Sequence, residues 1–168
     1  MLERELAENL LAQSRSIIEA LNLILLDVKP GDCSREIYDR LRLRVGHAIG
    51  AVIQLKQLVY EPYPEMNELA NLKLAEVEGN AEQRIEILLP ASVSPPPQNL
   101  DFAYASRIQA HGLNAIRELY VPALEAVFDS DELIEVKRSF GRIIGRIQEI
   151  LEVVVKVYPE LDDLRDQT

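Results

Sequence analysis

Residues 45–69 read VGHAIGAVIQLKQLVYEPYPEMNEL, and residues 140–164 read FGRIIGRIQEILEVVVKVYPELDDL. The two stretches align without a gap when each residue is paired with the one 95 positions further along the chain. Internal repetition of this kind is typical of architectures in which one structural unit occurs twice. The identical pairs are Gly46/Gly141, Ile49/Ile144, Gly50/Gly145, Val59/Val154, Tyr63/Tyr158, Pro64/Pro159, Glu65/Glu160 and Leu69/Leu164. The repeat therefore predicts two equivalent halves related by a pseudo-two-fold axis.

Apolar residues on both sides of the repeat recur every three or four positions, which is the period of an amphipathic α-helix. The predicted long helices cover residues 2–28, 34–60, 102–128 and 131–157. Pro and Gly in the turn at 29–32 end the first helix, and Ser34 is a suitable N-cap for the second. The β-branched run at 153–157 would read as a strand in isolation, but the helical period continues through it.

Each half is predicted to be a helical hairpin, and a lone hairpin exposes the apolar side of both its helices. The two hairpins should therefore pack against each other as a four-helix bundle, so the predicted fold class is all-α. We expect a single domain over residues 1–168. Its predicted parts are a first repeat unit at about 1–69, an additional helix at about 65–89, a proline-rich linker at 90–101 and a second repeat unit at about 102–164.

The composition of the chain disfavours nucleic acids and membranes as binding partners. Of the 168 residues, 48% are hydrophobic and 27% are charged, and the formal net charge is −10 with a pI of about 4.7. A strongly acidic chain is poorly suited to nucleic acid or to an anionic membrane surface, because both need clustered Lys and Arg. No stretch approaches the length of an apolar membrane span, and the lone cysteine, Cys33, fits a reducing compartment. We therefore expect a cytoplasmic protein that does not bind membranes.

Four glycines occupy matching places in the two copies: Gly46, Gly50, Gly141 and Gly145. A glycine inside a helix costs about 1 kcal/mol relative to alanine, so two in each copy need a physical cause. On a helical wheel they form a flat strip at the edge of the core-facing side, where another backbone could approach closely. The strip predicts a tight helix crossing, either between the two halves or in a homodimer. A ligand groove floored by bare backbone is the alternative.

A basic stripe accompanies the second copy alone. Arg138, Arg142 and Arg146 follow one another at four-residue steps on the predicted solvent-facing side, where the first copy carries no arginine. We expect these arginines to pair with nearby acids such as Glu135 and Glu149. The alternative is contact with a phosphate-bearing or acidic partner.

Arg40, Arg42, Arg44 and His47 form the one group of residues with a catalytic precedent. Four residues separate Arg42 from His47, a spacing that resembles the short motif of HEPN ribonucleases, which are dimeric helical bundles. The resemblance implies that His47 acts as general acid or base and that Arg42 stabilises charge developing on phosphate. It covers only residues 40–47, and Leu43 replaces the polar residue that usually follows the family's arginine.

The sequence gives little support for a metal site or a nucleotide-binding loop. The two histidines, His47 and His111, lack the Glu-x-x-His arrangement of a di-metal site, and no glycine-rich phosphate loop follows a strand. We therefore expect neither a metal nor a cofactor. The primary hypothesis is a non-enzymatic interaction or scaffold module that forms a homodimer or binds a protein partner. The second is a HEPN-like ribonuclease or a nucleotide-responsive helical-bundle protein that uses Arg42 and His47.

Overall fold

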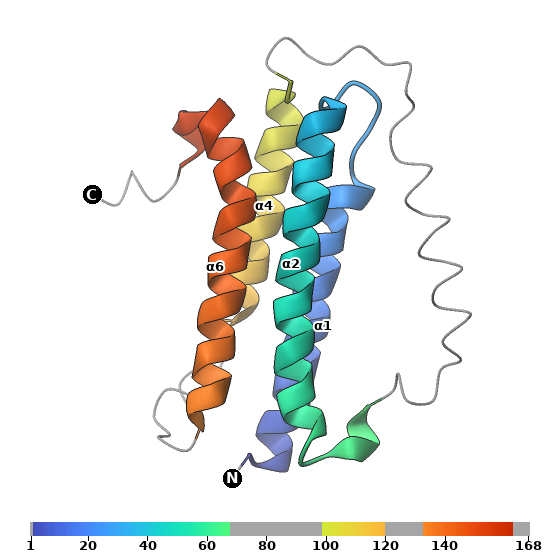
Figure 1. The fold of residues 1–168 in the computed structure, drawn as a ribbon, viewed down its shortest axis with the longest axis vertical. Coiled ribbons are helices and arrows are strands. Elements are labelled where there is room, and N and C mark those ends of the chain that lie inside the picture. Colours follow the sequence, from blue (N-terminus) through green and yellow to red (C-terminus); the bar gives the residue numbers. More distant parts are fainter. Residues whose placement is uncertain (1, 68–98, 120–132, 163–168) are drawn as a thin grey trace.

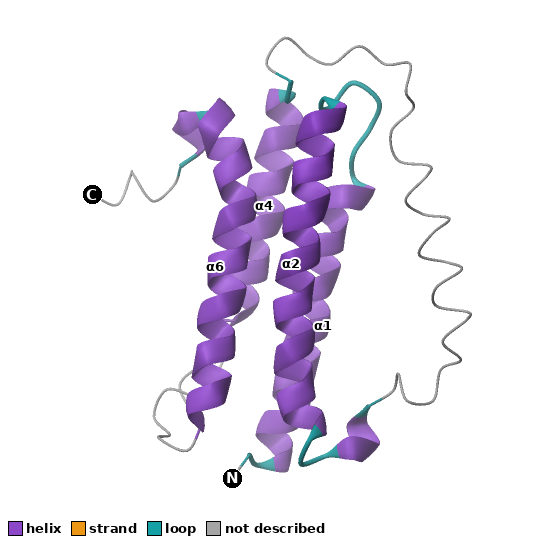
Figure 2. Ribbon diagram, in the orientation of Figure 1, coloured by secondary structure: helices purple, strands orange, loops and turns teal. Residues whose placement is uncertain are grey.

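The protein is all-helical in the part of the chain that the structure describes. The computed structural model describes residues 2–67, 99–119 and 133–162. Its long helices are α1 (Arg4–Leu26), α2 (Arg35–Tyr60), α4 (Phe102–Leu119) and α6 (Ile134–Val157), which lie side by side as a bundle (Figure 1). Figure 2 shows helices and loops but no strand among these residues. The prediction of an all-α helical bundle is confirmed.

Each long helix packs against two others. Helix α1 contacts α2 and α4, and α6 also contacts α2 and α4. Helices in contact run in opposite directions, and α2 and α6 form the side that faces the viewer in Figure 1. The bundle therefore has two sides, one made by α1 and α4 and the other by α2 and α6.

The bundle is held by one apolar core. Leu10, Ile17, Leu21 and Ile24 of α1 are completely buried, as are Leu41, Val52, Leu55 and Val59 of α2 and Ile143, Ile147 and Ile150 of α6. These residues recur at the helical period, so each helix presents one apolar side to the others. Burying one such side chain stabilises the fold by roughly 1.5–3 kcal/mol. None of the described helices is both long enough and apolar enough to cross a lipid bilayer.

The helix ends follow the predicted signals. The Ser34 hydroxyl accepts a hydrogen bond from the Ile37 amide at 3.2 Å, which confirms Ser34 as the N-cap of α2. Gly31 lies in the turn between α1 and α2 with a φ of 90°, which glycine adopts without steric cost. Helix α6 continues to Val157, so the β-branched run at 153–157 is helical, as predicted.

The same local structure follows α2 and α6. The 3-10 turn η1 (Pro64–Met66) comes after α2, and the 3-10 turn η4 (Pro159–Leu161) comes after α6. The tyrosine before each turn donates its hydroxyl to a carbonyl near the start of the same half. These hydrogen bonds join Tyr63 to Leu2 at 2.8 Å and Tyr158 to Leu100 at 2.7 Å. In each half, a hydrogen bond therefore joins the end of the second helix to the residues that precede the first helix.

The additional helix predicted at 65–89 does not begin where expected. The amides of Met66 and Asn67 bond back to carbonyls three residues earlier, which makes a single tight 3-10 turn, and Asn67 is extended. No α-helix therefore starts at Pro64. The rest of that predicted helix, most of the linker at 90–101 and the stretch at 120–132, where the predicted third helix ends and the fourth begins, lie outside the described residues.

Candidate functional site

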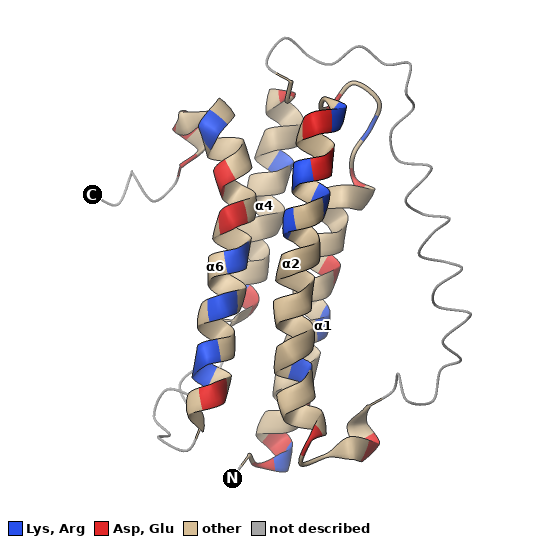
Figure 3. Cartoon of the chain, in the orientation of Figure 1, with Lys and Arg blue, Asp and Glu red and all other residues tan. Residues whose placement is uncertain are grey.

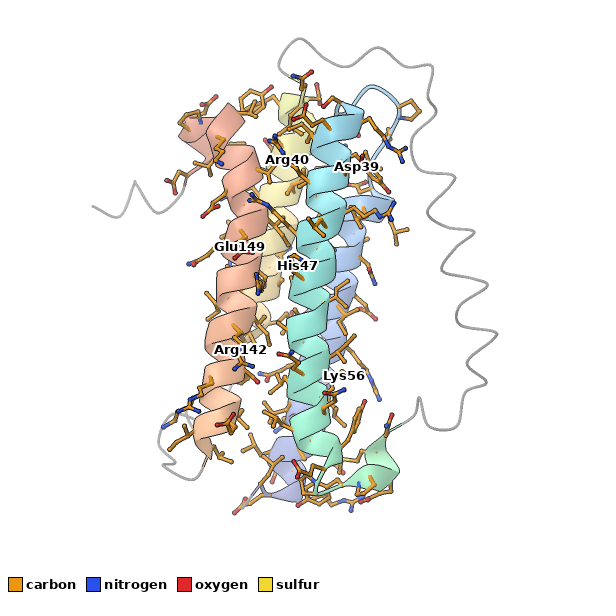
Figure 4. The ribbon with its side chains drawn as sticks, in the orientation of Figure 1. Asp39, Arg40, His47, Lys56, Arg142 and Glu149 are labelled. Atoms are coloured by element: carbon orange, nitrogen blue, oxygen red, sulfur yellow. The ribbon has the colours of Figure 1, made fainter. Side chains whose placement is uncertain are left out.

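The side of the bundle made by α2 and α6 carries most of the residues singled out from the sequence, and we call it the α2/α6 face. In Figure 3 a run of basic residues follows α6 beside a stretch of α2 with few charges. Arg138, Arg142 and Arg146 belong to this run and are all exposed. Figure 4 shows His47 on α2 and Arg142 on α6, on the same side of the molecule. The fold thus gathers repeated glycines, arginines and His47 on one face.

The four repeated glycines have no packed neighbour within the described chain. A Cβ atom added at Gly46, Gly50, Gly141 or Gly145 would meet nothing within 4 Å. The structure therefore does not show the tight crossing that was predicted between the two halves, because the glycines lie toward the outside of α2 and α6. The homodimer and the ligand groove stay predictions.

The glycine that allows close packing is Gly112, which sequence reasoning did not select. A Cβ atom at this position would lie 2.6 Å from Leu151 Cδ2 and 3.3 Å from Leu151 Cγ. Gly112 is buried in α4, so its missing side chain makes room for a leucine of α6. Its place in the core was visible in the sequence, because it lies between Ile108 and Ala115 on one helical stripe.

Helix α2 also carries a stripe on the side opposite the core, in which Gly50 is half-buried and the other residues are exposed. Leu43, Gly46, Gly50 and Ile53 follow one another at steps of three, four and three residues, and we call them the outward stripe. Leu43 and Ile53 are 61% and 42% exposed. At about 100° per residue, the outward stripe is centred roughly 160° from the buried stripe through Val52. It therefore points away from the apolar core, and its two glycines lie at the edge that faces α6.

A shallow groove lies beside the outward stripe, between α2 and α6. We call it the α2/α6 groove; its volume is about 380 Å³, and it is lined by Gly46, His47, Gly50, Ala51, Gln54, Arg142 and Arg146. Its polar side chains are His47 and Gln54 from α2 and two guanidinium groups from α6. A neighbouring depression of about 480 Å³ is lined by Asp39, Arg42, Leu43, Gly46 and His47. The two hollows share Gly46 and His47, so they are neighbours on α2.

The arginines of α6 differ in their partners. Arg138 pairs with Glu135 at 2.8 Å, and Arg146 pairs with Glu149 at 3.2 Å, as expected from the sequence. The Arg142 guanidinium instead donates to the amide oxygen of Gln54 at 3.3 Å. Among the described residues no carboxylate pairs with Arg142, so its positive charge is uncompensated in the α2/α6 groove.

Two of the three arginines of the HEPN-like group are held away from His47. Arg40 pairs with an acid one turn earlier on α2, at 2.8 Å. Arg44 reaches across to α6, where it donates to a backbone carbonyl and lies 3.6 Å from a carboxylate. Arg42 alone lines a hollow together with His47. The structure therefore does not bring all of these arginines together at the histidine.

A polar cluster that the sequence did not predict lies where the turn between α1 and α2 meets α4. Arg107 of α4 stands between two carboxylates, 2.8 Å from Asp27 and 2.9 Å from Asp32. His111 Nε2 lies 3.5 Å from Asp27, and the Tyr104 hydroxyl donates to a carbonyl of α1. These contacts tie the turn to α4, and only the fold brings their partners together.

The buried thiol beside this cluster is not a nucleophile. Cys33 is 3% exposed, and burial, with a smaller effect from the negative charge of Asp32, raises the pKa of its thiol from 9.0 to about 12. The reactive form of a cysteine is the thiolate, which is scarcely populated here at neutral pH. Burial likewise raises the pKa of the Tyr104 hydroxyl. We therefore assign this end of the bundle a structural role.

No group of three or more His, Cys, Asp and Glu side chains is placed to hold a metal ion within residues 2–67, 99–119 and 133–162. A comparison of the chain with known protein families, curated proteins and solved structures found no match. The function is therefore argued from the geometry of the α2/α6 face.

Proposed function

We propose that the protein is a cytoplasmic, non-enzymatic helical interaction module that forms a homodimer through the outward stripe of α2. The observation that carries the proposal is the open space around Gly46 and Gly50. Each helical glycine costs about 1 kcal/mol relative to alanine, and no packing within the described chain compensates for that cost. A second helix laid on the stripe does compensate, because the missing side chains let its backbone come close.

The spacing of the outward stripe favours a second copy of the same helix. The steps from Leu43 to Ile53 are three, four and three residues, and they read the same in reverse. A two-fold interface places residue i of one copy against residue j of the other, and residue j against residue i. In an antiparallel crossing of two α2 helices, Leu43 faces Ile53 of the second copy. Gly46 then faces Gly50 of the second copy, at the centre.

The charges of α2 are compatible with this crossing. Between residues 45 and 53 the helix carries no Lys, Arg, Asp or Glu. Two copies can therefore meet along this stretch without placing like charges opposite each other, which would cost affinity. The exposed arginines of α6 lie beside this crossing, at the rim of the interface, and interface rims are usually polar.

Light scattering coupled to size exclusion tests the proposal on the full chain. We expect the wild type to be a dimer and Gly50→Leu to be a monomer, because the new side chain fills the space needed by the second backbone. The matched control is Gly141→Leu, which adds the same side chain to open space on α6 and should leave the dimer intact. Circular dichroism should show equal helical content in all three proteins. A monomeric wild type, or a dimeric Gly50→Leu variant, contradicts the proposal.

We further propose that the two halves descend from one duplicated unit and are related by a pseudo-two-fold axis. Three observations support this: the repeated sequence, the 3-10 turn after both α2 and α6, and the tyrosine that closes each half. The packing of α1 on α4 and of α2 on α6 is compatible with such an axis, because each helix contacts its counterpart in the other half. A comparison of tyrosine variants in the two halves, given in the Discussion, tests the equivalence.

The HEPN-like alternative has one observation in its favour, because Arg42 and His47 line the same hollow. In that case the wild type cleaves single-stranded RNA, and Arg42→Ala and His47→Ala each abolish the cleavage. The interaction module predicts no cleavage by any of these proteins. Incubating the purified chain with RNA under metal-free conditions separates the two functions.

A further inference from the structure

We infer that the α2/α6 groove binds the phosphate group of a small phosphate monoester, held by Arg142 and Arg146 over the bare backbone at Gly46 and Gly50. This site goes beyond the homodimer and does not rest on it. The antiparallel crossing would cover Gly46 and Gly50, which line the groove, so the phosphate binds the monomer and competes with the dimer. The inference starts from a hollow on the α2/α6 face that two arginine side chains of α6 line together.

The chemistry of the groove matches a doubly charged oxyanion. Arg142 and Arg146 stand one helical turn apart on α6, and His47 faces the same groove from α2. Guanidinium groups bind phosphate through two parallel N–H donors, which gives both charge and geometric fit. A phosphate monoester carries a charge of about −1.5 to −2 at neutral pH, which two arginines neutralise. A carboxylate carries half that charge and fits the pair less well.

Both arginines are available to a ligand. Within the described residues, the polar partner of Arg142 is a neutral amide oxygen, at 3.3 Å across the groove. Arg146 pairs with Glu149, but the two side chains are 46% and 42% exposed, and exposed pairs contribute little to stability. A phosphate can therefore replace both partners without removing a contact on which the fold depends.

The groove also has room for the organic part of the ligand. The neighbouring depression of about 480 Å³ shares Gly46 and His47 with the groove and is also lined by Leu43, Asp39 and Arg42. Its apolar part, at Gly46 and Leu43, is a surface that an aromatic or aliphatic group can cover, which removes apolar area from water. The ligand is therefore an organic phosphate with its phosphate at α6 and its organic part beside α2.

Nuclear magnetic resonance on the full chain labelled with ¹⁵N tests the site, with phenyl phosphate as the probe. We expect the amide signals of Gly46 and Gly50 to shift saturably and that of Gly112, in α4, to stay in place. Combining Arg142→Gln with Arg146→Gln should weaken binding by at least about tenfold, because both charged donors are lost. The matched control is Arg138→Gln, which lies on the same stripe outside the groove and should bind within about twofold of wild type.

Three results overturn the inference: no saturable shift of the groove glycines, an Arg138→Gln loss as large as that of the double variant, or equal binding of benzoate. The comparison of phenyl phosphate with benzoate on the wild type decides the matter even if the double variant does not fold. Light scattering on the same samples before the probe is added keeps the two proposals apart, because binding to a wild type that is already monomeric refutes the homodimer and leaves the phosphate site standing.

Discussion

The α1/α4 side and the α2/α6 side of the bundle share one apolar core but differ in how their polar residues are used. Where α4 meets the turn after α1, Arg107 lies between two carboxylates and Tyr104 reaches a backbone carbonyl. On the α2/α6 face Arg142 contacts a neutral amide, and Gly46 and Gly50 face open space. The charged groups around Arg107 find partners within the chain, whereas Arg142 on the α2/α6 face has no carboxylate partner among the described residues. This difference is why we place the function on the α2/α6 face.

The largest effect should separate the packed glycine from the open ones. Gly112→Leu forces a side chain into the space of Leu151, and such overpacking typically costs about 1–3 kcal/mol. Gly141→Leu adds the same atoms where no neighbour lies within 4 Å and gains up to about 1 kcal/mol of helix propensity. Urea unfolding of the two variants measures the difference in free energy. Equal stability in both would mean that the two glycines are not packed differently.

The second contrast compares an arginine on the α1/α4 side with an arginine on the α2/α6 side. Arg107→Ala should destabilise the fold by about 1–3 kcal/mol, because it leaves Asp27 and the largely buried Asp32 without their partner. Arg138→Ala removes an exposed pair and should change the stability by less than about 0.5 kcal/mol. Thermal unfolding at matched protein concentration compares them. A larger loss of stability for Arg138→Ala than for Arg107→Ala would contradict the structural role that we give to the α1/α4 side.

Alkaline pH should lower the free energy of unfolding through the buried thiol of Cys33. The folded chain keeps this thiol neutral because burial raises its pKa from 9.0 to about 12, while the unfolded chain ionises it from about pH 9. Its contribution to stability is therefore complete below pH 9 and is lost as the pH rises toward 12. Urea unfolding at about pH 8, 9 and 10 should show a steeper loss for wild type than for Cys33→Ala. The same slope in both proteins would show that the thiol is not the group responsible.

The smallest effect compares the two halves directly. Tyr63→Phe and Tyr158→Phe each remove one partly buried hydrogen bond to a carbonyl, so each should cost about 1 kcal/mol. If the halves are equivalent, the two costs should agree and add in the double variant, because the bonds share no partner. Chemical unfolding of the four proteins gives this comparison. A large loss of stability for one tyrosine variant and none for the other would show that the two tyrosines do not have equivalent roles.

The fold could be predicted because its signals are local. The apolar period, the turn around Gly31 and the Ser34 cap each act within a few residues, and each appears in the structure at the expected place. The additional helix at 65–89 was wrong at its start, because Pro64 and Glu65 are equally good residues for a single 3-10 turn. A helix-start signal does not by itself say how many turns follow.

The site could be predicted only in pieces. Sequence reasoning selected His47, Gly46 and Gly50 of α2 and Arg142 and Arg146 of α6, but treated them as separate features. Their meeting in one groove depends on the register of α2 against α6, which no local pattern encodes. The cluster around Arg107 was missed for the same reason, because its partners at Asp27 and Asp32 lie far away in sequence.

The tyrosine contacts that close each half have a consequence for how the chain can be divided. A cut between residues 67 and 99 breaks neither the bond from Tyr63 to Leu2 nor the one from Tyr158 to Leu100. Each fragment keeps its own hairpin and the apolar surface that recognises the other. The two pieces should therefore reassemble when they are made separately, so that the protein could serve as a split pair whose reunion reports the proximity of whatever is fused to them.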